Sequence, residues 1–378
     1  GYFNLNEDIL PDIPISTSCV RASDFDSDGD LDLFVGGRVI PGKYPYPADS
    51  KLLKNVGGEF KDVTEEVLPE LTGIGLVNDA LWTDFNNDQL IDLILIGEWI
   101  PVTFFRNTGN GFKNITGSLD LDPMTGWWNS IHGADIDNDG DTDYILGNLG
   151  LNTIFKGTAE APLKIFAADF DLNGVIDPVL ASLASDEHFQ PKYFPLHTRD
   201  DMIMQLSFIR NSIPTYKGYG RATVDDIFTP EELEGAYYKE GDNFRTLILL
   251  NEGNERFENK ELPAEVQFAP VFGILPADIN TDGNIDILFT GNDYSIEPMS
   301  GRIDAFNGLV LTGEAKGDFE VIKLRKAGFK VPGDAKGFAR IFDADGNELF
   351  LATQNKDSVL VFRKTTEHSF LKVPEDAL

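Results

Sequence analysis

The sequence predicts an all-β fold made of repeated units that close into one ring. Three observations support this prediction. A nine-residue acidic loop occurs five times along the chain, each copy leads directly into a run of β-forming residues, and several of these runs end in turns typical of β-hairpins. The length of 378 residues would allow two or three ordinary domains, but the repeats favour a single unit.

The first acidic loop spans Asp24 to Asp32 and is followed by the apolar run Leu33-Phe34-Val35. Acidic residues occupy positions 1, 3, 5, 7 and 9 of the loop, and Gly29 occupies position 6. Unpaired carboxylates at contact distance repel one another by several kcal/mol even at the effective dielectric of a protein surface. Calcium relieves this repulsion, because it takes oxygen ligands from such side chains and from backbone carbonyls. The glycine permits the sharp turn, so the sequence predicts a calcium loop that enters a β-strand.

Four further copies begin at Asp84, Asp135, Asp169 and Asp278, and each keeps an oxygen-bearing side chain at positions 1, 3, 5 and 9. The second copy has Gln89 where glycine is expected. A sixth copy, residues 341–349, has apolar residues at both ends, and we expect it to turn without metal. The prediction is therefore about five calcium ions, one in each complete loop. The expected ligands, with position 7 contributing a backbone carbonyl, are Asp24, Asp26, Asp28, Asp30, Asp32, Asp84, Asn86, Asp88, Leu90, Asp92, Asp135, Asp137, Asp139, Asp141, Asp143, Asp169, Asp171, Asn173, Val175, Asp177, Asp278, Asn280, Asp282, Asn284 and Asp286.

Two other interpretations of these loops agree less well with the sequence. An EF-hand needs a bidentate glutamate at position 12 and flanking helices. Position 12 is apolar in every copy, and the residues around it are β-formers: it is Val35, Leu95, Leu146, Leu180 and Phe289 in turn. A solvated acidic turn would be a reasonable interpretation of a single copy, but five copies that each lead into a strand argue against it.

These loops and strands resemble the FG-GAP, or VCBS-type, repeats of integrin α-subunit heads and many bacterial surface proteins. The resemblance covers roughly the whole chain except residues 183–244. It implies a β-propeller over residues 1–378, with metal loops at the strand turns of successive blades. Six motifs suggest six blades, and seven are possible if a blade without the motif lies between the fourth and fifth loops.

Residues 183–244 have a different pattern, which predicts an insertion within one blade, mostly helix and loop. Apolar residues recur at helical spacing over residues 200–210. Thr229 and Pro230 have the types expected at the cap and first position of a helix. At the two ends of the chain, we expect the strand at residues 1–5 to complete the blade formed by residues 359–371, which would close the ring and leave no exposed edge.

The composition limits the function and location. The net charge is −32, and five calcium ions would still leave about −22, so nucleic acid is an unsuitable partner. The single cysteine, Cys19, allows no internal disulfide, which favours a bacterial exported protein. No apolar run is long enough to span a membrane. The chain starts at Gly1 without a signal peptide, and we expect a piece of a longer secreted protein or a mature chain. Calcium binding favours an extracellular, cell-surface or periplasmic location.

The topology of antiparallel blades predicts a binding face. The metal loops precede their strands, so the segments that follow those strands lie on the opposite face of the disc. This places the insertion and a group of aromatic residues together, far from the ions, where binding loops are commonly found. The alternative is that these aromatic residues only cover the blade cores. The candidate ligand-binding residues are Tyr44, Tyr46, Trp99, Trp127, Trp128 and Tyr294.

Two common catalytic motifs are absent from the sequence, although His188 and His197 both lie in the insertion, where a site stays possible. The histidines (His132, His188, His197 and His368) form no HExxH motif, there is no GxSxG motif, and most carboxylates belong to the acidic loops. The favoured function is a calcium-stabilised, non-enzymatic binding or scaffold module at a cell surface, with a protein or glycan ligand. Two alternatives stay open: a polysaccharide-active enzyme on a calcium-bearing propeller, and a purely structural spacer.

Overall fold

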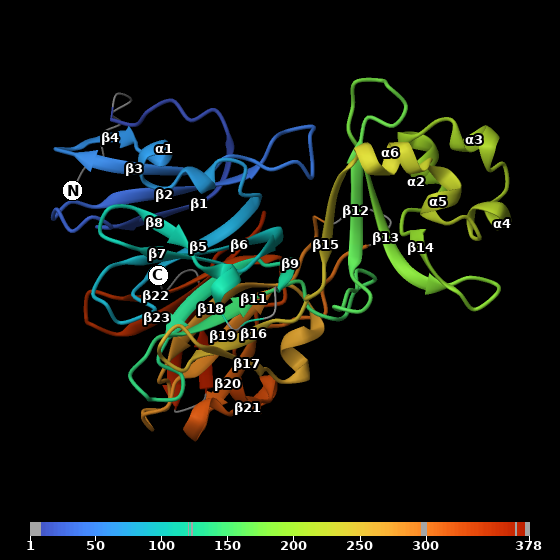
Figure 1. Ribbon diagram of the computed structural model, residues 1–378. Coiled ribbons are helices and arrows are strands. Elements are labelled where there is room, and N and C mark those ends of the chain that lie inside the picture. Colours follow the sequence, from blue (N-terminus) through green and yellow to red (C-terminus); the bar gives the residue numbers. More distant parts are fainter. Residues whose placement is uncertain (1–8, 120, 122–123, 296–300, 367–368, 375–378) are drawn as a thin grey trace.

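Six separate antiparallel sheets make up the molecule in the computed structural model, which describes residues 9–119, 121, 124–295, 301–366 and 369–374 (Figure 1). Within these residues no sheet closes on itself, and the helices are all short. The all-β prediction is therefore confirmed. Among the same residues, no helix is both long and apolar enough to cross a lipid bilayer.

Five of the sheets follow the chain strand by strand or nearly so. The first contains β1 (Ser16–Ser23), β2 (Asp32–Val39), β3 (Lys51–Val56) and β4 (Glu59–Asp62). The second contains β5 (Leu76–Thr83), β6 (Asp92–Pro101), β7 (Thr103–Asn107) and β8 (Phe112–Asn114). A further strand, β9 (Thr125–Trp127), pairs with β6 of the second sheet. The third contains β10 (Ser130–Ala134), β11 (Asp143–Gly147), β16 (Leu247–Asn251) and β17 (Phe257–Glu261). The fourth contains β18 (Val271–Ala277), β19 (Asp286–Gly291), β20 (Leu309–Gly313) and β21 (Phe319–Ile322). The fifth contains β22 (Ala335–Phe342), β23 (Glu348–Gln354), β24 (Leu360–Thr366) and β25 (Ser369–Lys372).

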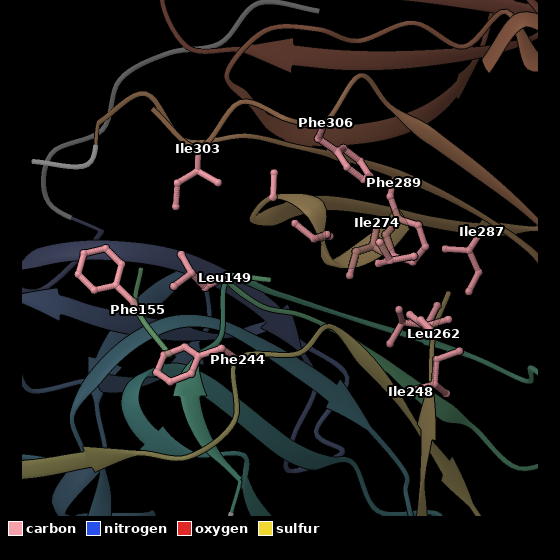
Figure 2. Close-up of a cluster of buried hydrophobic side chains, with 14 of the residues drawn as sticks. Leu149, Phe155, Phe244, Ile248, Leu262, Ile274, Ile287, Phe289, Ile303 and Phe306 are labelled. Atoms are coloured by element: carbon pink, nitrogen blue, oxygen red, sulfur yellow. The ribbon is translucent and has the colours of Figure 1, made fainter. Parts of the chain in front are cut away.

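These five sheets pack on one another in chain order through their first strands. β1 and β2 contact β5, β5 contacts β10, β10 contacts β18, and β18 contacts β22. The side chains between the sheets are aliphatic and aromatic, and the largest buried cluster joins β16, β18, β19 and the segments beside them (Figure 2). Ile248, Ile274 and Phe289 are at most 1% exposed in this cluster. Burial of such side chains stabilises a fold by about 1.5–3 kcal/mol each, so the serial stacking has a strong energetic basis.

The third sheet is interrupted between β11 and β16 by the sixth sheet, which has the order β14-β13-β12-β15. Its strands are β12 (Leu163–Ala168), β13 (Asp177–Ser185), β14 (Pro191–Pro195) and β15 (Tyr237–Gly241), and it carries the helices α2 (Arg199–Gln205), α3 (Ile209–Ser212), α4 (Tyr216–Tyr219), α5 (Val224–Ile227) and α6 (Pro230–Gly235). Figure 1 shows this part, which we call the inserted lobe (residues 163–241), standing apart from the other five sheets.

The inserted lobe has a hydrophobic core of its own. Val179 of β13, Met202 of α2 and Phe228 after α5 are buried against one another there. Threonines at the helix starts accept backbone N–H groups, as Thr229 does at α6. At the neck of the lobe, Asn148 links the two chain segments: its N–H donates to Thr246 Oγ1 at 3.0 Å and its Nδ2 donates to the Asn243 carbonyl at 2.9 Å.

Residues 183–244, for which the sequence predicts helix and loop, contain the end of β13, β14, the five helices of the lobe and β15. The lobe also includes strands that precede this range. The helices outside it are α1 (Thr64–Val67) and α7 (Leu324–Ala327), with short 3-10 turns at Pro69–Leu71, Thr116–Ser118, Ala264–Phe268 and Ala315–Gly317. The expected N-terminal strand, residues 1–5, lies outside the described residues.

Candidate metal loops and the opposite cavity

The five acidic loops occupy equivalent places in five sheets. They join β1 to β2, β5 to β6, β10 to β11, β12 to β13, and β18 to β19. In each case the aspartate at position 9 is the first residue of the second strand. The fourth loop, residues 169–177, belongs to the inserted lobe and so lies away from the other four, which sit on the sheets that pack in series.

All five loops have the same backbone conformation. Position 4 has a φ of 60° to 65° in every copy, and position 6 has a positive φ as well, 97° at Gly29. The position-1 carboxylate closes each loop by accepting the N–H groups of positions 5 and 6: Asp24 accepts from Asp28 and Gly29, both at 3.0 Å. The same pair of hydrogen bonds is present at Asp84, Asp135, Asp169 and Asp278.

Gln89, at position 6 of the second loop, adopts a φ of 72° that is costly for a residue with a Cβ atom. Its side chain is exposed, and it is the backbone N–H that donates to Asp84. We expect Gln89→Gly to raise the free energy of unfolding by about 0.5–1 kcal/mol, measured by urea denaturation. Gln89→Ala is the control and should give no gain, because alanine has the same steric restriction. If the Gln89→Gly and Gln89→Ala variants were equally stable, the positive φ of residue 89 would not be strained.

The position-9 aspartates are buried, at 0% or 1% exposed. One oxygen of each accepts the N–H of position 2, and in four loops the other oxygen accepts an N–H from the third strand of the sheet, as Asp143 does from Asn251 at 2.8 Å. Burial raises the pKa of Asp92 to about 7 and the pKa of Asp143 and Asp177 to about 6. A bound cation would favour the charged form of these groups instead.

The carboxylates converge in a manner that suits a cation. Ligand atoms at positions 1, 3 and 9 lie within 4.8 Å of one another in the first, third and fourth loops. In the second and fifth loops position 3 is Asn86 or Asn280, which offers an amide oxygen instead. Asp171 Oδ1 is buried without a hydrogen-bond partner among the described residues. In the first loop Lys54 Nζ pairs with Asp26 and with Asp28. The unpaired buried oxygen of Asp171 and the Lys54 ammonium group bound by two carboxylates both fit a site for a positive ion.

Two of the polar side chains at position 7 have other partners. Asp141 accepts a hydrogen bond from Asn87 of the neighbouring loop at 2.7 Å, and Asn284 donates to Asp282 at 3.0 Å. The N–H of position 7 donates to the side chain of position 5 in all five loops. These contacts leave the position-7 carbonyl as the atom that could contribute to a metal site.

A cavity of about 490 Å³ lies at the other end of the same strands. The second strands start at the acidic loops and run away from them for roughly 20 Å, at about 3.3 Å per residue. Arg38 of β2, Glu98 of β6, Leu180 of β13 and Asp293 after β19 all line the cavity. The cavity therefore collects residues from several sheets on the side opposite their loops. Leu180 of the inserted lobe also lines it, although Leu180 follows closely after its own acidic loop, which ends at Asp177.

Three of the candidate ligand-binding residues meet at this cavity. Tyr44 and Trp127 line it, and Trp99 packs edge-on against Trp127 with ring centroids 5.4 Å apart. The Trp99 Nε1 donates to the Tyr44 hydroxyl at 2.8 Å. Burial and the neighbouring Glu98 raise the pKa of Tyr44 well above its usual value, so its hydroxyl stays protonated and donates to Glu98 at 3.2 Å. Leu149 and Phe155, labelled in Figure 2, complete this side of the wall.

The other three aromatic candidates lie elsewhere. Tyr46 stacks on Tyr237 of the inserted lobe, with centroids 4.9 Å apart. Tyr294 donates to the Pro332 carbonyl at 3.1 Å and lines a different hollow. Trp128 is 0% exposed, and its Nε1 donates to the Met124 carbonyl. The prediction that Trp128 belongs to a binding face is corrected: it is a core residue, because neighbouring residues of an extended chain point to opposite sides.

Comparison with known proteins identifies the family of the first three acidic loops. A family model described as an FG-GAP-like repeat matches residues 24–95 and 84–146. Residues 24–146 are FG-GAP-like repeats. They contain the first three acidic loops, and the resemblance stated from the sequence is confirmed for this part of the chain. No curated protein matches the chain.

Among solved structures, the crystal structure of the V. cholerae biofilm matrix protein Bap1 is similar over 94% of this chain and 68% of that chain. The sequence identity is 7% and the TM-score is 0.31. A similarity of this size supports no conclusion about the present chain.

Two asparagines each connect one sheet to the acidic loop of the preceding sheet, and sequence reasoning missed them. Asn107 Nδ2 donates to the carbonyls of Phe25 at 2.8 Å and Ile91 at 3.0 Å, and therefore ties the second sheet to the first acidic loop. Asn251 Nδ2 donates in the same way to Phe85 at 3.0 Å, which ties the third sheet to the second loop. The available signal was the Asn-x-Gly turn that begins at each of these residues.

Two histidines, His132 and His197, have structural surroundings in the described part of the chain. His132, on β10, is partly buried, and burial lowers its pKa. His197 Nε2 accepts the Leu180 N–H at 3.1 Å. His188 is exposed in the lobe, and His368 lies outside the described residues.

Proposed function

We propose that this chain is a calcium-stabilised β-propeller that serves as a non-enzymatic extracellular binding or scaffold module. Its ligand, a protein or a glycan, binds on the face opposite the acidic loops. The serial packing of five sheets through their first strands supports the propeller, because successive blades of a propeller contact one another in this way. The FG-GAP-like repeats support the same architecture.

The donor set of the loops supports calcium as the ion. Each loop offers only oxygen atoms, from carboxylates, amides and a backbone carbonyl, and nitrogen and sulfur ligands are absent from all nine positions. Oxygen-only sites with several carboxylates suit calcium, whereas zinc and copper prefer nitrogen or sulfur. Calcium at the millimolar concentrations found outside cells would fill such sites, which supports an extracellular location.

The observation that carries the binding function is the separation of the two ends of the sheets. The acidic loops tie one end, and the cavity opens at the other end of the same strands, between residues of several sheets and the inserted lobe. A mostly apolar, concave surface held by rigid elements is where proteins commonly bind ligands. An arrangement with rigid metal loops at one end and a hollow at the other suits a module that presents a binding surface.

The test is to block the cavity and measure binding to a panel of immobilised glycans and extracellular matrix proteins in calcium. Leu180→Arg places a long charged side chain at the cavity wall, and Ser295→Trp adds bulk from an exposed position on a second wall. Leu172→Arg is the matched control, because Leu172 is 88% exposed in the fourth acidic loop. We expect at least one panel member to bind the chain and both cavity variants to weaken binding by about tenfold or more.

Two results would overturn the proposal. One is a panel without any binder. The other is an equal loss of binding in Leu172→Arg and in the cavity variants. Release of cleaved product from a panel glycan would instead support the polysaccharide-active enzyme.

A further inference from the structure

The strongest unassigned feature of the molecule is a pair of buried N–H donors beside the cavity. Trp127 Nε1 and Asn129 Nδ2 are inaccessible to solvent and have no hydrogen-bond partner among the described residues. Both residues line the cavity. Buried donors in folded proteins are nearly always paired. Because these two are closed to solvent, a bound molecule can supply their acceptor oxygens only if the side chains turn towards the cavity.

Each charged group of the cavity has a partner within the protein. Glu98 pairs with Arg38, and Asp293 pairs at 3.4 Å with Lys336, which also pairs with Asp334 at 2.9 Å. The two carboxylates therefore offer acceptor atoms without an unpaired negative charge, and the two cations are likewise engaged. A charged ligand would have to break one of these pairs, whereas a neutral ligand would not.

The polar groups alternate with apolar surface. Rings of Tyr44, Trp127 and Phe155 and the side chain of Leu180 form much of the wall. The ligand that fits this lining must offer acceptors to two N–H donors, hydroxyl donors to two carboxylates, and C–H groups to the aromatic rings. A hydroxyl group is both a donor and an acceptor, and a sugar ring carries several hydroxyls around an apolar face. The volume of about 490 Å³ is in the range of small-molecule sites.

We propose that this cavity binds an uncharged sugar residue at the end of a glycan, and that Trp127 and Asn129 turn on binding so that Trp127 Nε1 and Asn129 Nδ2 donate to its oxygens. This inference rests on the proposed binding function and specifies its ligand. Arg38, Glu98 and Asp293 position the hydroxyl groups, and the inserted lobe supplies Leu180 as one wall.

The test uses the calcium-loaded chain on an array of neutral glycans, acidic glycans and peptides. Trp127→Phe keeps a ring against Trp99 and Phe155 but removes the N–H, and Asn129→Asp keeps the shape but replaces a donor by an acceptor. The matched control is Trp82→Phe, because the Trp82 Nε1 donates to the Arg21 carbonyl away from the cavity. We expect binding to at least one neutral glycan, a loss of about tenfold in Trp127→Phe, a larger loss in Asn129→Asp, and no change in Trp82→Phe.

A free monosaccharide identical to the terminal residue should compete for the site. The inference is overturned if only acidic glycans or peptides bind, or if Trp127→Phe and Asn129→Asp bind the neutral glycan as the unmodified chain does. If a protein from the panel binds and Leu180→Arg weakens that binding, the proposed function stands and the sugar site alone fails. If nothing binds at this face, both fail.

Discussion

Removal of calcium by a chelator should lower the melting temperature by about 10 °C or more, because an ion bound only by the folded state stabilises it by about 2.7 kcal/mol per site at one hundred times its dissociation constant. The reason lies in the loops: without an ion, carboxylate oxygens at positions 1, 3 and 9 of the first, third and fourth loops are held within 4.8 Å of one another. The measurement is a thermal melt followed by circular dichroism, with and without chelator.

Return of calcium should restore the original melt, and magnesium should restore less of it, because magnesium demands a stricter octahedral geometry. A melt that does not respond to chelation would show that the loops are stable without ions, and the calcium proposal would then fail.

Asp143→Ala should destabilise the chain by about 2–5 kcal/mol even in chelator, because it leaves two buried N–H groups without an acceptor. Asp143 is 0% exposed and accepts from Ile136 at 2.7 Å and from Asn251 at 2.8 Å. Urea denaturation in chelator isolates this effect from the loss of a metal ligand.

The matched control is Asp139→Ala, at the exposed position 5 of the same loop. The Asp139 side chain accepts from the Asp141 N–H at 2.9 Å, at the surface, where water can replace it. We therefore expect a loss of less than about 1 kcal/mol in chelator. Equal losses in the two variants would contradict the structural role assigned to position 9.

The local parts of the structure could be predicted from the sequence. Each acidic loop and the strand that follows it are specified within about a dozen residues, so the five loops and the all-β class were evident. The meeting of Tyr44, Trp99 and Trp127 also followed, because antiparallel strands that leave one face must end at the other. The error at Trp128 came from treating two adjacent residues as one unit.

The pairing of distant segments could not be predicted in the same way. β12 pairs with β15 across more than sixty residues, and this pairing makes the lobe a sheet with helices instead of helix and loop alone. No local pattern in residues 237–241 identifies that partner. The orphaned donors of Trp127 and Asn129 are also invisible in the sequence, because they depend on which oxygens the fold brings within reach.

The neck at Asn148 has an evolutionary consequence. Leu146 of β11 and Leu247 of β16 are direct partners across one ladder, so a tight hairpin could join them without moving any other strand. The whole lobe could thus be replaced in evolution by another insertion while the other five sheets stay unchanged. Since Leu180 belongs to the lobe, each replacement would also change one wall of the cavity. Proteins with identical acidic loops could then bind different ligands.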